Sequence, residues 1–405
     1  RLYGSAAGAQ PARCLKALRS FLDIYGERAA PRLFSAPGRA EIGGNHTDHQ
    51  GGRVLAAAVT LDILAVVAPS RDGLVRIKSD GYPMLKVHTR ELAPKKHERG
   101  GSHALVRGVA DGLRRAGFRL GGFDAFMTSE VPKGSGLSSS AAFGVLVGSI
   151  FSGLYNGGAI PPLALAQAAR HAENRYFGKP SGLMDQLAAA EGGFTFIDFA
   201  DAARPRVRRI ERTLRPLGWT LCIVAPGGGH ARLTHEYAAI PADMDAVAAQ
   251  FKKPHLSSVR EEDFYQALGS LRGRVGDRAL LRAMHFFSEN ARVPAMAEAL
   301  EAGDMPRLAA LLNASGESSF KRLQNIWPAA PQERSLALAL ALSERLLAGR
   351  GAWRVHGGGF AGTILALMPA GALPDYAAEM TRVFGEGCCY PLEVRPAGGA
   401  ELLPG

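Results

Sequence analysis

The sequence is short of cysteine, and it lacks long apolar runs. Four cysteines among 405 residues are too few for a disulfide scaffold, and none forms the Cys-x-x-Cys pair typical of metal and redox sites. No apolar run reaches the roughly 18 residues that cross a membrane, because Asp62 interrupts the longest one. The first eight residues contain no apolar core of a signal peptide. We therefore expect a cytoplasmic location and no membrane partner.

Repeats and dense basic segments are also missing, although the formal net charge is +11. The absence of a repeat period excludes solenoids and propellers. Basic residues are dispersed and aromatic residues make up only 7% of the chain, so no nucleic-acid partner is expected. The positive charge favours smaller acidic ligands such as nucleotides. Nothing in the sequence indicates an obligate protein partner.

What is present is the composition of a folded protein, with 47% hydrophobic and 21% charged residues. This composition excludes wholesale disorder, and the length is enough for two domains. Strand-like segments such as 54–67 and helix-like segments such as 137–155 alternate without a regular βαβ rhythm, which favours an α+β fold. Arg and Pro gather at 201–216, so we expect an N-terminal domain over 1–205 and a C-terminal domain over 206–405.

The most informative segment is 132–141, which reads Pro-Lys-Gly-Ser-Gly-Leu-Ser-Ser-Ser-Ala. Glycines let a ligand approach the backbone, and the N-terminus of a following helix presents unpaired N–H groups, a combination that binds phosphate. A helix N-cap explains one serine without any ligand, but not three after Gly-x-Gly. A Walker loop is excluded, because proline follows the Gly-Lys pair at 178–179. Residues 357–362 match the dinucleotide pattern, but a strand-like segment follows them, so we reject that interpretation.

A second segment, 37–52, gathers polar and charged side chains among five glycines. Such density is costly inside a fold unless a ligand satisfies it. One interpretation is a metal site of His46, Asp48 and His49, although the binuclear hydrolase signature requires a further His where a glycine stands. The other is a hydroxyl-binding set of Asn45, His46 and Asp48 that converges on a sugar.

Two carboxylates stand out further along the chain. Asp185 lies in apolar surroundings, where an ionised Asp needs a partner, and Arg39 is the candidate. An Asp held by an Arg keeps a low pKa, which suits orienting a hydroxyl nucleophile better than accepting its proton. Glu173 has polar neighbours on a helix, and its own surroundings favour a solvated helix face.

Three separated motifs point to one family. Residues 38–49 read Gly-Arg-Ala-Glu-Ile-Gly-Gly-Asn-His-Thr-Asp-His, residues 132–141 form the Gly/Ser segment, and residues 357–362 read Gly-Gly-Gly-Phe-Ala-Gly. In this order and spacing they resemble the motifs of the GHMP small-molecule kinase superfamily and, within it, of the galactokinase family. The Met-Asp-Gln segment at 184–186 also falls where galactokinases carry it. The resemblance covers the chain from about residue 34 to residue 368.

The resemblance implies a two-domain GHMP kinase architecture. Its N-terminal domain is similar to ribosomal protein S5 domain 2, its C-terminal domain is ferredoxin-like, and the active site lies in the cleft between them. The implied activity is ATP-dependent phosphorylation of the anomeric hydroxyl of galactose to galactose 1-phosphate. The alternatives are a GHMP kinase for a related sugar or amino sugar, and a catalytically silent sensor that binds galactose and ATP.

The resemblance also implies roles for individual residues. Asp185 acts as base or orienting group for the anomeric hydroxyl, and Arg39 stabilises the transition state. Mg²⁺ is held by Ser140 and Glu173, which replaces the solvated-face interpretation of Glu173. The sugar is bound by Asn45, His46, Thr47, Asp48 and Tyr237. ATP is bound by Ser79, Gly134, Ser135, Gly136, Leu137, Ser138, Ser139 and Ser140.

The first motif departs from the family's Gly-Arg-Val-Asn-Leu-Ile-Gly-Glu-His-Thr-Asp-Tyr at several positions. The family's Glu, which receives a sugar hydroxyl, is Asn45 here, the family's Asn is Glu41, and the Tyr that ends the motif is His49. Glu only accepts hydrogen bonds, whereas Asn both donates and accepts. These changes leave phosphoryl transfer intact and concern the identity of the sugar.

Overall fold

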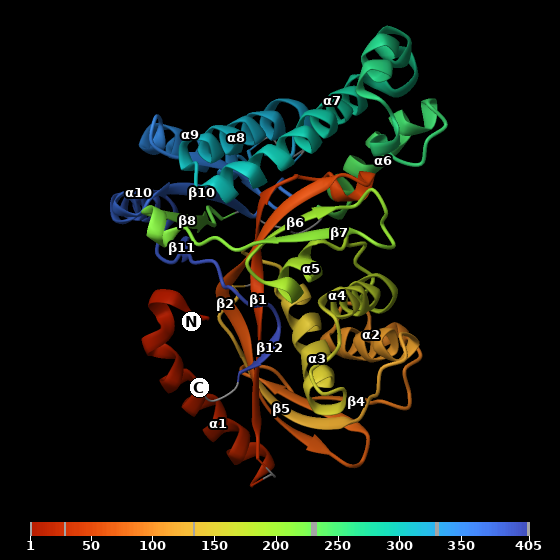
Figure 1. Cartoon of the computed structure of the whole chain (residues 1–405), viewed down its shortest axis with the longest axis vertical. Helices are drawn as coiled ribbons and strands as arrows, with labels where there is room; N and C mark the ends of the chain where they lie inside the picture. The colour runs from red at the N-terminus through yellow and green to blue at the C-terminus, as the bar shows by residue number, and fades with distance from the viewer. Residues whose placement is uncertain (1, 28–29, 133, 228–232, 329–331, 403–405) are drawn as a thin grey trace.

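The computed structural model describes residues 2–27, 30–132, 134–227, 233–328 and 332–402. These residues form two β-sheets with helices packed on them (Figure 1). The large sheet has eight strands, in the order β12-β1-β2-β5-β3-β4, with β6 attached to β2 and β7 to β6. The small sheet has the order β11-β8-β10-β9. Mixed sheets and helices without a βαβ rhythm confirm the α+β prediction.

The elements have the following bounds. The strands are β1 (Arg32–Gly43), β2 (Arg53–Ser70), β3 (Leu74–Ser79), β4 (Leu85–His88), β5 (Gly122–Ser129), β6 (Phe194–Asp198), β7 (Arg206–Ile210), β8 (Trp219–Val224), β9 (Ala352–His356), β10 (Thr363–Pro369), β11 (Cys389–Leu392) and β12 (Ala400–Leu402). The helices are α1 (Gln10–Tyr25), α2 (Ser102–Arg115), α3 (Ser139–Tyr155), α4 (Pro162–His171), α5 (Met184–Glu191), α6 (Thr234–Gln250), α7 (Glu261–Ala302), α8 (Met305–Ser318), α9 (Ser335–Leu347) and α10 (Leu373–Phe384). Even α7, the longest, lacks the apolar length to cross a membrane, as do the other helices of the described ranges.

The strand predicted at 54–67 is confirmed as part of β2. It is buried on both faces because α1 packs on one side of the sheet and α3 and α5 pack on the other (Figure 1). Asp62, which interrupts the apolar run, is fully buried and lies 2.6 Å from an Arg13 nitrogen and 2.9 Å from an Arg395 nitrogen. These two arginines balance the charge that the strand carries into the core.

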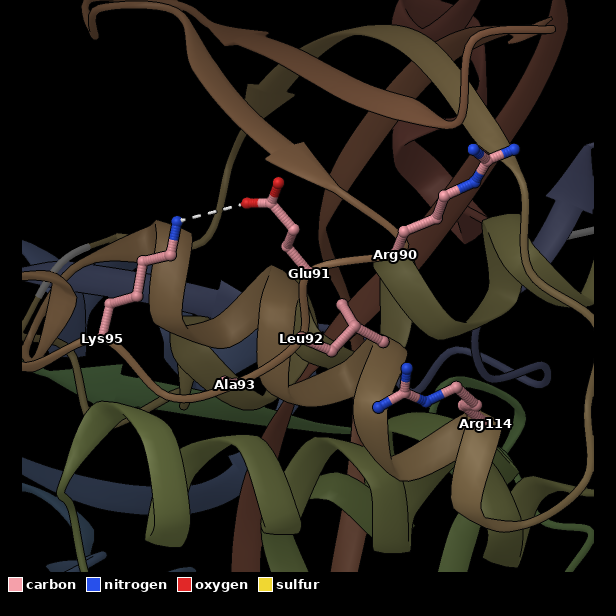
Figure 2. Close-up of a pocket in the computed structure, with 6 residues that line it drawn as sticks. All are labelled: Arg90, Glu91, Leu92, Ala93, Lys95 and Arg114. Atoms are coloured by element: carbon pink, nitrogen blue, oxygen red, sulfur yellow. Dashed lines mark ion pairs between the residues drawn. The ribbon is translucent and has the colours of Figure 1, made fainter.

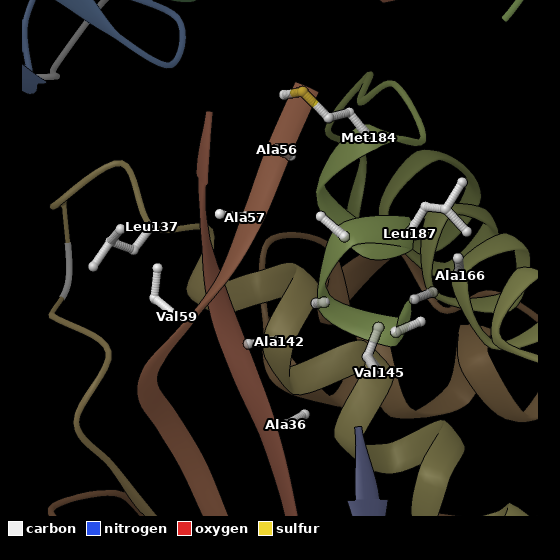
Figure 3. Close-up of a cluster of buried hydrophobic side chains, with 14 of the residues drawn as sticks. Ala36, Ala56, Ala57, Val59, Leu137, Ala142, Val145, Ala166, Met184 and Leu187 are labelled. Carbon is white, nitrogen blue, oxygen red and sulfur yellow. The ribbon is translucent and has the colours of Figure 1, made fainter. Parts of the chain in front are cut away.

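Small side chains bring α3 and α5 close to the strands that carry the first motif. Ala36 of β1 and Ala57 of β2 are fully buried in one cluster with Val145 of α3 and Leu187 of α5 (Figure 3). Larger side chains at these alanines would force the helices outward, because packed interiors accommodate little added volume. The positions of the two helix N-termini therefore depend on this packing.

The predicted domain boundary separates the two sheets only in part. The small sheet and the helices from α6 to α10 all follow residue 205. However, β7 pairs with β6, and β12 near the chain end pairs with β1, so both belong to the large sheet. The division into 1–205 and 206–405 stays a prediction, with these two strands as its exceptions.

Two helices, α7 and α8, cover residues 282–313. Helix α7 ends at Gly303, whose φ is +75°, and α8 begins after Asp304. The Asp304 carboxylate accepts a hydrogen bond of 3.0 Å from the backbone N–H of Arg307. A glycine in the left-handed region followed by an Asp N-cap ends one helix and starts the next.

Candidate active site

Arg39 joins the first motif, residues 38–49, to the Gly/Ser segment at 132–141, here called the phosphate-loop segment. It lies at a bulge of β1, where its backbone N–H donates to the Leu137 carbonyl at 3.1 Å. Its guanidinium donates to the Gly136 carbonyl. A Cβ on Gly38 would lie only 3.0 Å from the Leu137 oxygen, so glycine permits this close packing. Lys133, also in the phosphate-loop segment, lies outside the described residues.

The phosphate-loop segment turns tightly into α3. Gly134 and Gly136 have φ values of +73° and +70°, and Ser138, the N-cap residue of α3, has +56°. The Ser138 hydroxyl donates to Asp185 and makes no cap hydrogen bond, so an N-cap role does not explain this serine. Within the described residues no side chain caps the first turn of α3, which leaves its backbone N–H groups available to an anion. Leu137 is buried in the core, so only its backbone can face a ligand.

Asp185 lies in the first turn of α5 and faces both Arg39 and Ser138. Arg39 Nε lies 2.7 Å from Oδ1, and the Ser138 hydroxyl donates to Oδ2. Burial alone would raise the pKa of Asp185, but the positive charges of Arg39 and Lys179 and the Ser138 hydrogen bond outweigh it. The pKa of Asp185 is therefore held below its usual value, and the carboxylate is ionised at neutral pH. The expected Arg39 partner is present.

Glu173 lies in a π-helical turn that follows α4, and only 1% of its surface is exposed. The solvated-face interpretation is therefore wrong. Its Oε1 accepts a hydrogen bond from the Ser140 hydroxyl. Its Oε2 accepts one of 3.0 Å from Gln186 Nε2 and lies 3.3 Å from Lys179 Nζ. Single π-turns are frequent at functional sites, and this one directs a carboxylate toward the start of α3.

Ser140 and Glu173 together present oxygen ligands that suit Mg²⁺. This ion prefers oxygen and is usually bound by one or two carboxylates together with substrate phosphates, so the pair fits it. The alternative hydrolase site has less support. Within the described ranges, no three His, Cys, Asp or Glu side chains are grouped so that they could hold a metal ion, and this includes the 46–49 segment.

The glycine-rich turn between β9 and β10 binds the sugar-binding candidates through three consecutive carbonyl groups. The oxygens of residues 357–359 accept hydrogen bonds, in order, from Asn45 Nδ2 at 2.7 Å, His46 Nε2 at 3.0 Å and the Tyr237 hydroxyl at 3.1 Å. Strand β10 follows this turn, which confirms the rejection of a dinucleotide site. The first and third motifs, more than 300 residues apart, thus form one structure.

His46 and Asp48 offer polar atoms to a ligand. In the described contacts, His46 uses Nε2 and Asp48 uses Oδ1, while His46 Nδ1 and Asp48 Oδ2 make no hydrogen bond. A Cβ on Gly182 would lie 1.9 Å from Asp48 Oδ2, so that glycine makes room for the carboxylate. Thr47 differs, because it is buried and its hydroxyl bonds to backbone carbonyls of its own loop at 2.6 and 2.9 Å.

Asn45 is placed differently from the other predicted sugar contacts. Its side chain has 0% exposure, and both of its amide atoms bond to protein groups. The resemblance implied that Asn45 contacts the sugar, but the Asn45 side chain has no polar atom free to do so.

Ser79, the predicted nucleotide contact outside the loop, lies at the end of β3. This strand runs parallel to β5, with Ser79 opposite Met127. Strand β5 ends at Ser129, just before the phosphate-loop segment. Because parallel strands end at the same edge of a sheet, Ser79 and the start of the loop share one edge.

Several residues of this region were not predicted from the sequence. Lys179 lies beside Glu173. In the sequence it was considered only as part of the rejected Walker loop. His356 accepts the Glu41 N–H at 3.0 Å and contacts the Thr363 hydroxyl at 3.1 Å. Thr363 in turn donates to the Ser135 carbonyl at 3.0 Å, which ties the phosphate loop to the small sheet. No local signal joins positions so far apart in sequence.

Burial lowers the pKa of three histidines in this region. The pKa of His46 falls to about 4, and that of His285 also lies below its usual value. Burial, with the positive charges of Arg39 and Arg354, holds the pKa of His356 well below its usual value. All three imidazoles are therefore neutral at pH 7.

These histidines predict a loss of stability in mild acid. The unfolded chain takes up protons at each His as the pH falls through about 6.5, whereas the folded chain does not until about pH 4 at His46. The free energy of unfolding should therefore fall with decreasing pH below 6.5, by up to about 4 kcal/mol per pH unit for three groups. Urea unfolding at pH 7.5, 6.5 and 5.5 measures this. An exposed control, His97→Gln, should leave the slope unchanged, and a flat profile to pH 5.5 contradicts the prediction.

A cavity of about 410 Å³ lies away from these residues. It is lined by Arg90, Glu91, Leu92, Ala93, Lys95 and Arg114, and Lys95 Nζ lies 3.8 Å from a Glu91 carboxylate oxygen (Figure 2). None of the predicted site residues lines it, so the cavity is not part of the candidate site.

The chain is similar to proteins that share this architecture. Residues 19–69 match the family model described as the galactokinase galactose-binding signature, and residues 104–193 match the GHMP kinases N terminal domain. A galactokinase of Streptomyces coelicolor is 32% identical over 393 residues, which cover 95% of this chain and 97% of that protein. Among solved structures, Lactococcus lactis galactokinase complexed with galactose matches with a TM-score of 0.82 at 24% identity, covering 96% of this chain and 100% of that one. Methanococcus jannaschii mevalonate kinase matches at 0.64 and 15%, covering 91% and 99%.

The fold and the three joined motifs define a GHMP kinase, and the resemblance noted from the sequence is confirmed. Within that superfamily the chain belongs to the galactokinase family. It is accordingly a sugar kinase, a phosphotransferase.

Proposed function

We propose that this protein transfers the γ-phosphoryl group of ATP to the anomeric hydroxyl of galactose, giving galactose 1-phosphate and ADP. The observation that carries the proposal is the placement of the Asp185 carboxylate between Arg39 and Ser138, at the uncapped N-terminus of α3. One carboxylate, one guanidinium and one phosphate-binding helix end thereby meet at a single point. Phosphoryl transfer depends mainly on such positioning and charge neutralisation.

Asp185 orients the nucleophile in this mechanism. Its lowered pKa makes it a weak proton acceptor and a strong hydrogen-bond acceptor for the sugar hydroxyl. It takes up the proton late, once bond formation to phosphorus has drawn electron density from the attacking hydroxyl oxygen and made its proton acidic. Arg39, bound at once to Asp185 and to the Gly136 carbonyl, holds positive charge beside the transferring group.

ATP and Mg²⁺ use the second motif. The segment from Gly134 to Ser140 and the N-terminus of α3 cradle the phosphates, and Ser79 contacts the nucleotide from the same sheet edge. Ser140 and Glu173 would hold Mg²⁺, which would neutralise negative charge on the phosphates. Lys179 lies where it adds a further positive charge.

The sugar is bound by the segment that the glycine turn holds. Asp48 Oδ2 accepts from sugar hydroxyls, the C3 and C4 pair being the expected partners. His46, neutral and with Nε2 bound to the Gly358 carbonyl, presents Nδ1 as an acceptor. The Tyr237 hydroxyl, from α6, bonds to the next carbonyl of the same turn, that of Gly359. Thr47 shapes the loop from within.

Replacing Glu173 should weaken the response to Mg²⁺. Glu173→Gln keeps the shape and the Ser140 contact but removes the charge, so the Mg²⁺ concentration for half-maximal activity should rise at least about tenfold. Glu191→Gln, on the far end of α5, is the matched control and should change nothing. Titrating activity against Mg²⁺ at saturating ATP and galactose measures the shift. An unchanged Mg²⁺ requirement contradicts the assigned role.

ADP release with Mg·ATP tests the proposed function directly. The panel consists of galactose, galactosamine, glucose, arabinose and mevalonate. Turnover with galactose well above the other four supports the proposal. Turnover with another sugar keeps the mechanism and changes the substrate. No turnover, with galactose binding still measurable by calorimetry, would mean that the protein is a sensor.

A further inference from the structure

We infer that Glu41, Asn45 and Arg354 form a positioning network, which holds the sugar-binding segment against the glycine turn without touching the sugar. The inference rests on the proposed function, since it concerns how the sugar site is held. It makes Asn45 a positioning residue in place of a sugar contact.

The Asn45 side chain makes all the hydrogen bonds of which it is capable with protein groups. A side-chain amide has two N–H donors and two acceptor lone pairs. Nδ2 donates to Glu41 Oε1 at 2.9 Å and to the Gly357 carbonyl at 2.7 Å. Oδ1 accepts from Asn325 Nδ2 at 2.9 Å and from the Ser319 hydroxyl at 3.3 Å. All four positions are used, and none remains for a sugar hydroxyl.

The ion pair of Glu41 and Arg354 links the two sheets. Arg354 of β9, in the small sheet, lies 2.7 Å from Glu41 Oε1 of β1, in the large sheet. It also donates to the Ile42 carbonyl at 2.8 Å. Both side chains are buried, and removing either partner of such a pair leaves an uncompensated charge in the interior. The relative position of β1 and β9 therefore depends on this pair.

Arg354 and Asn45 both donate a hydrogen bond to the same oxygen, Oε1 of Glu41. An amide is required at residue 45 because it donates a hydrogen bond to Glu41. A carboxylate there would place two hydrogen-bond acceptors opposite each other.

The network is connected to the sugar site both along the chain and through the glycine turn. His46 directly follows Asn45 in the chain, and Asp48 lies two residues further on. The Asn45 carbonyl accepts a hydrogen bond of 3.0 Å from His285 Nε2, and its amide binds the same glycine turn that His46 binds. A shift of Asn45 would therefore move the His46 ring and the Asp48 carboxylate together.

Three variants test the inference: Asn45→Glu, Glu41→Asn and the double exchange. Each single variant should raise KM for galactose at least about tenfold, because a buried polar group loses its partner. Each should also lower the unfolding midpoint by about 5–10 °C. KM for ATP should stay unchanged. The double exchange restores one carboxylate and one amide, although not the donor to the Gly357 carbonyl, so it should recover part of both losses.

A control and a selectivity measurement separate positioning from other roles. Arg395→Met breaks a buried ion pair whose contacts include no predicted site residue, so it should lower the midpoint while leaving KM for galactose unchanged. The ratio of kcat/KM for galactose to that for each monodeoxygalactose should be the same in wild type and in the double exchange. A ratio that changes for one deoxy sugar only would show that residue 45 contacts that hydroxyl, and would overturn the inference.

Additive losses in the double exchange would also overturn it, because independent residues do not rescue each other. The midpoints decide this point without any turnover. If wild type fails to phosphorylate galactose, the proposed function fails, while rescue or additivity of the unfolding midpoints still tests the network.

Discussion

Asp185→Asn should reduce kcat for galactose by about 10³- to 10⁴-fold. The variant keeps the size of the side chain and the Ser138 contact but removes the charge that orients the sugar hydroxyl. Galactose and ATP affinities should change by less than about threefold, because neither ligand depends on Asp185 for most of its contacts. Single-turnover kinetics together with calorimetric binding separate the two effects.

The control for this experiment is Glu191→Gln, a carboxylate at the other end of α5. It should retain wild-type kcat. A circular dichroism spectrum and an unchanged ATP affinity show that the Asp185→Asn protein is folded with its phosphate loop formed. Activity of the Asp185 variant within tenfold of wild type would remove Asp185 from the mechanism.

Arg39→Lys should reduce kcat by about 10²- to 10³-fold. Lysine keeps the positive charge, but its single ammonium cannot reach both the Asp185 carboxylate and the Gly136 carbonyl, which the guanidinium binds together. The loss should therefore appear in kcat, with a smaller change in KM for ATP. Steady-state kinetics with galactose and ATP varied in turn measure the split.

Arg32→Lys is the matched control for Arg39→Lys. Arg32 lies on the same strand and also bridges a carboxylate, Glu401, and a backbone carbonyl, that of Gly153. Its replacement should lower stability slightly and leave kcat unchanged. If both variants lose activity equally, the effect of Arg39→Lys comes from β1 as a whole and not from the site.

The parts of the site that could be predicted from the sequence are contiguous. The phosphate-loop segment combines glycines, serines and a following helix within ten residues, so its chemistry is visible before folding. Asp185 could be singled out because a charge in an apolar segment needs a partner. The rejection of a dinucleotide site at 357–362 also needed only local information, the strand that follows the turn.

The parts that could not be predicted depend on tertiary packing. Whether Glu173 faces solvent or the core is decided by a π-turn, which shifts the helix face without an evident sequence signal. His356 and Thr363 reach the phosphate loop across more than 200 residues. The burial of Asn45 is likewise set by partners from distant segments, Gly357 and Asn325. The position of Asn45 in the motif suggested a contact with the ligand. Its hydrogen bonds, which are all made to protein groups, argue against that contact.

In the proposed reaction, the Asp185 carboxylate directs phosphoryl transfer to one particular sugar oxygen. The most direct test is identification of the product of wild-type protein, galactose and Mg·ATP by ³¹P and ¹H nuclear magnetic resonance. We expect one sugar phosphate, with phosphorus coupled to the anomeric proton, formed in equal amount to ADP. Phosphate on another hydroxyl, or ADP release without any sugar phosphate, would contradict it.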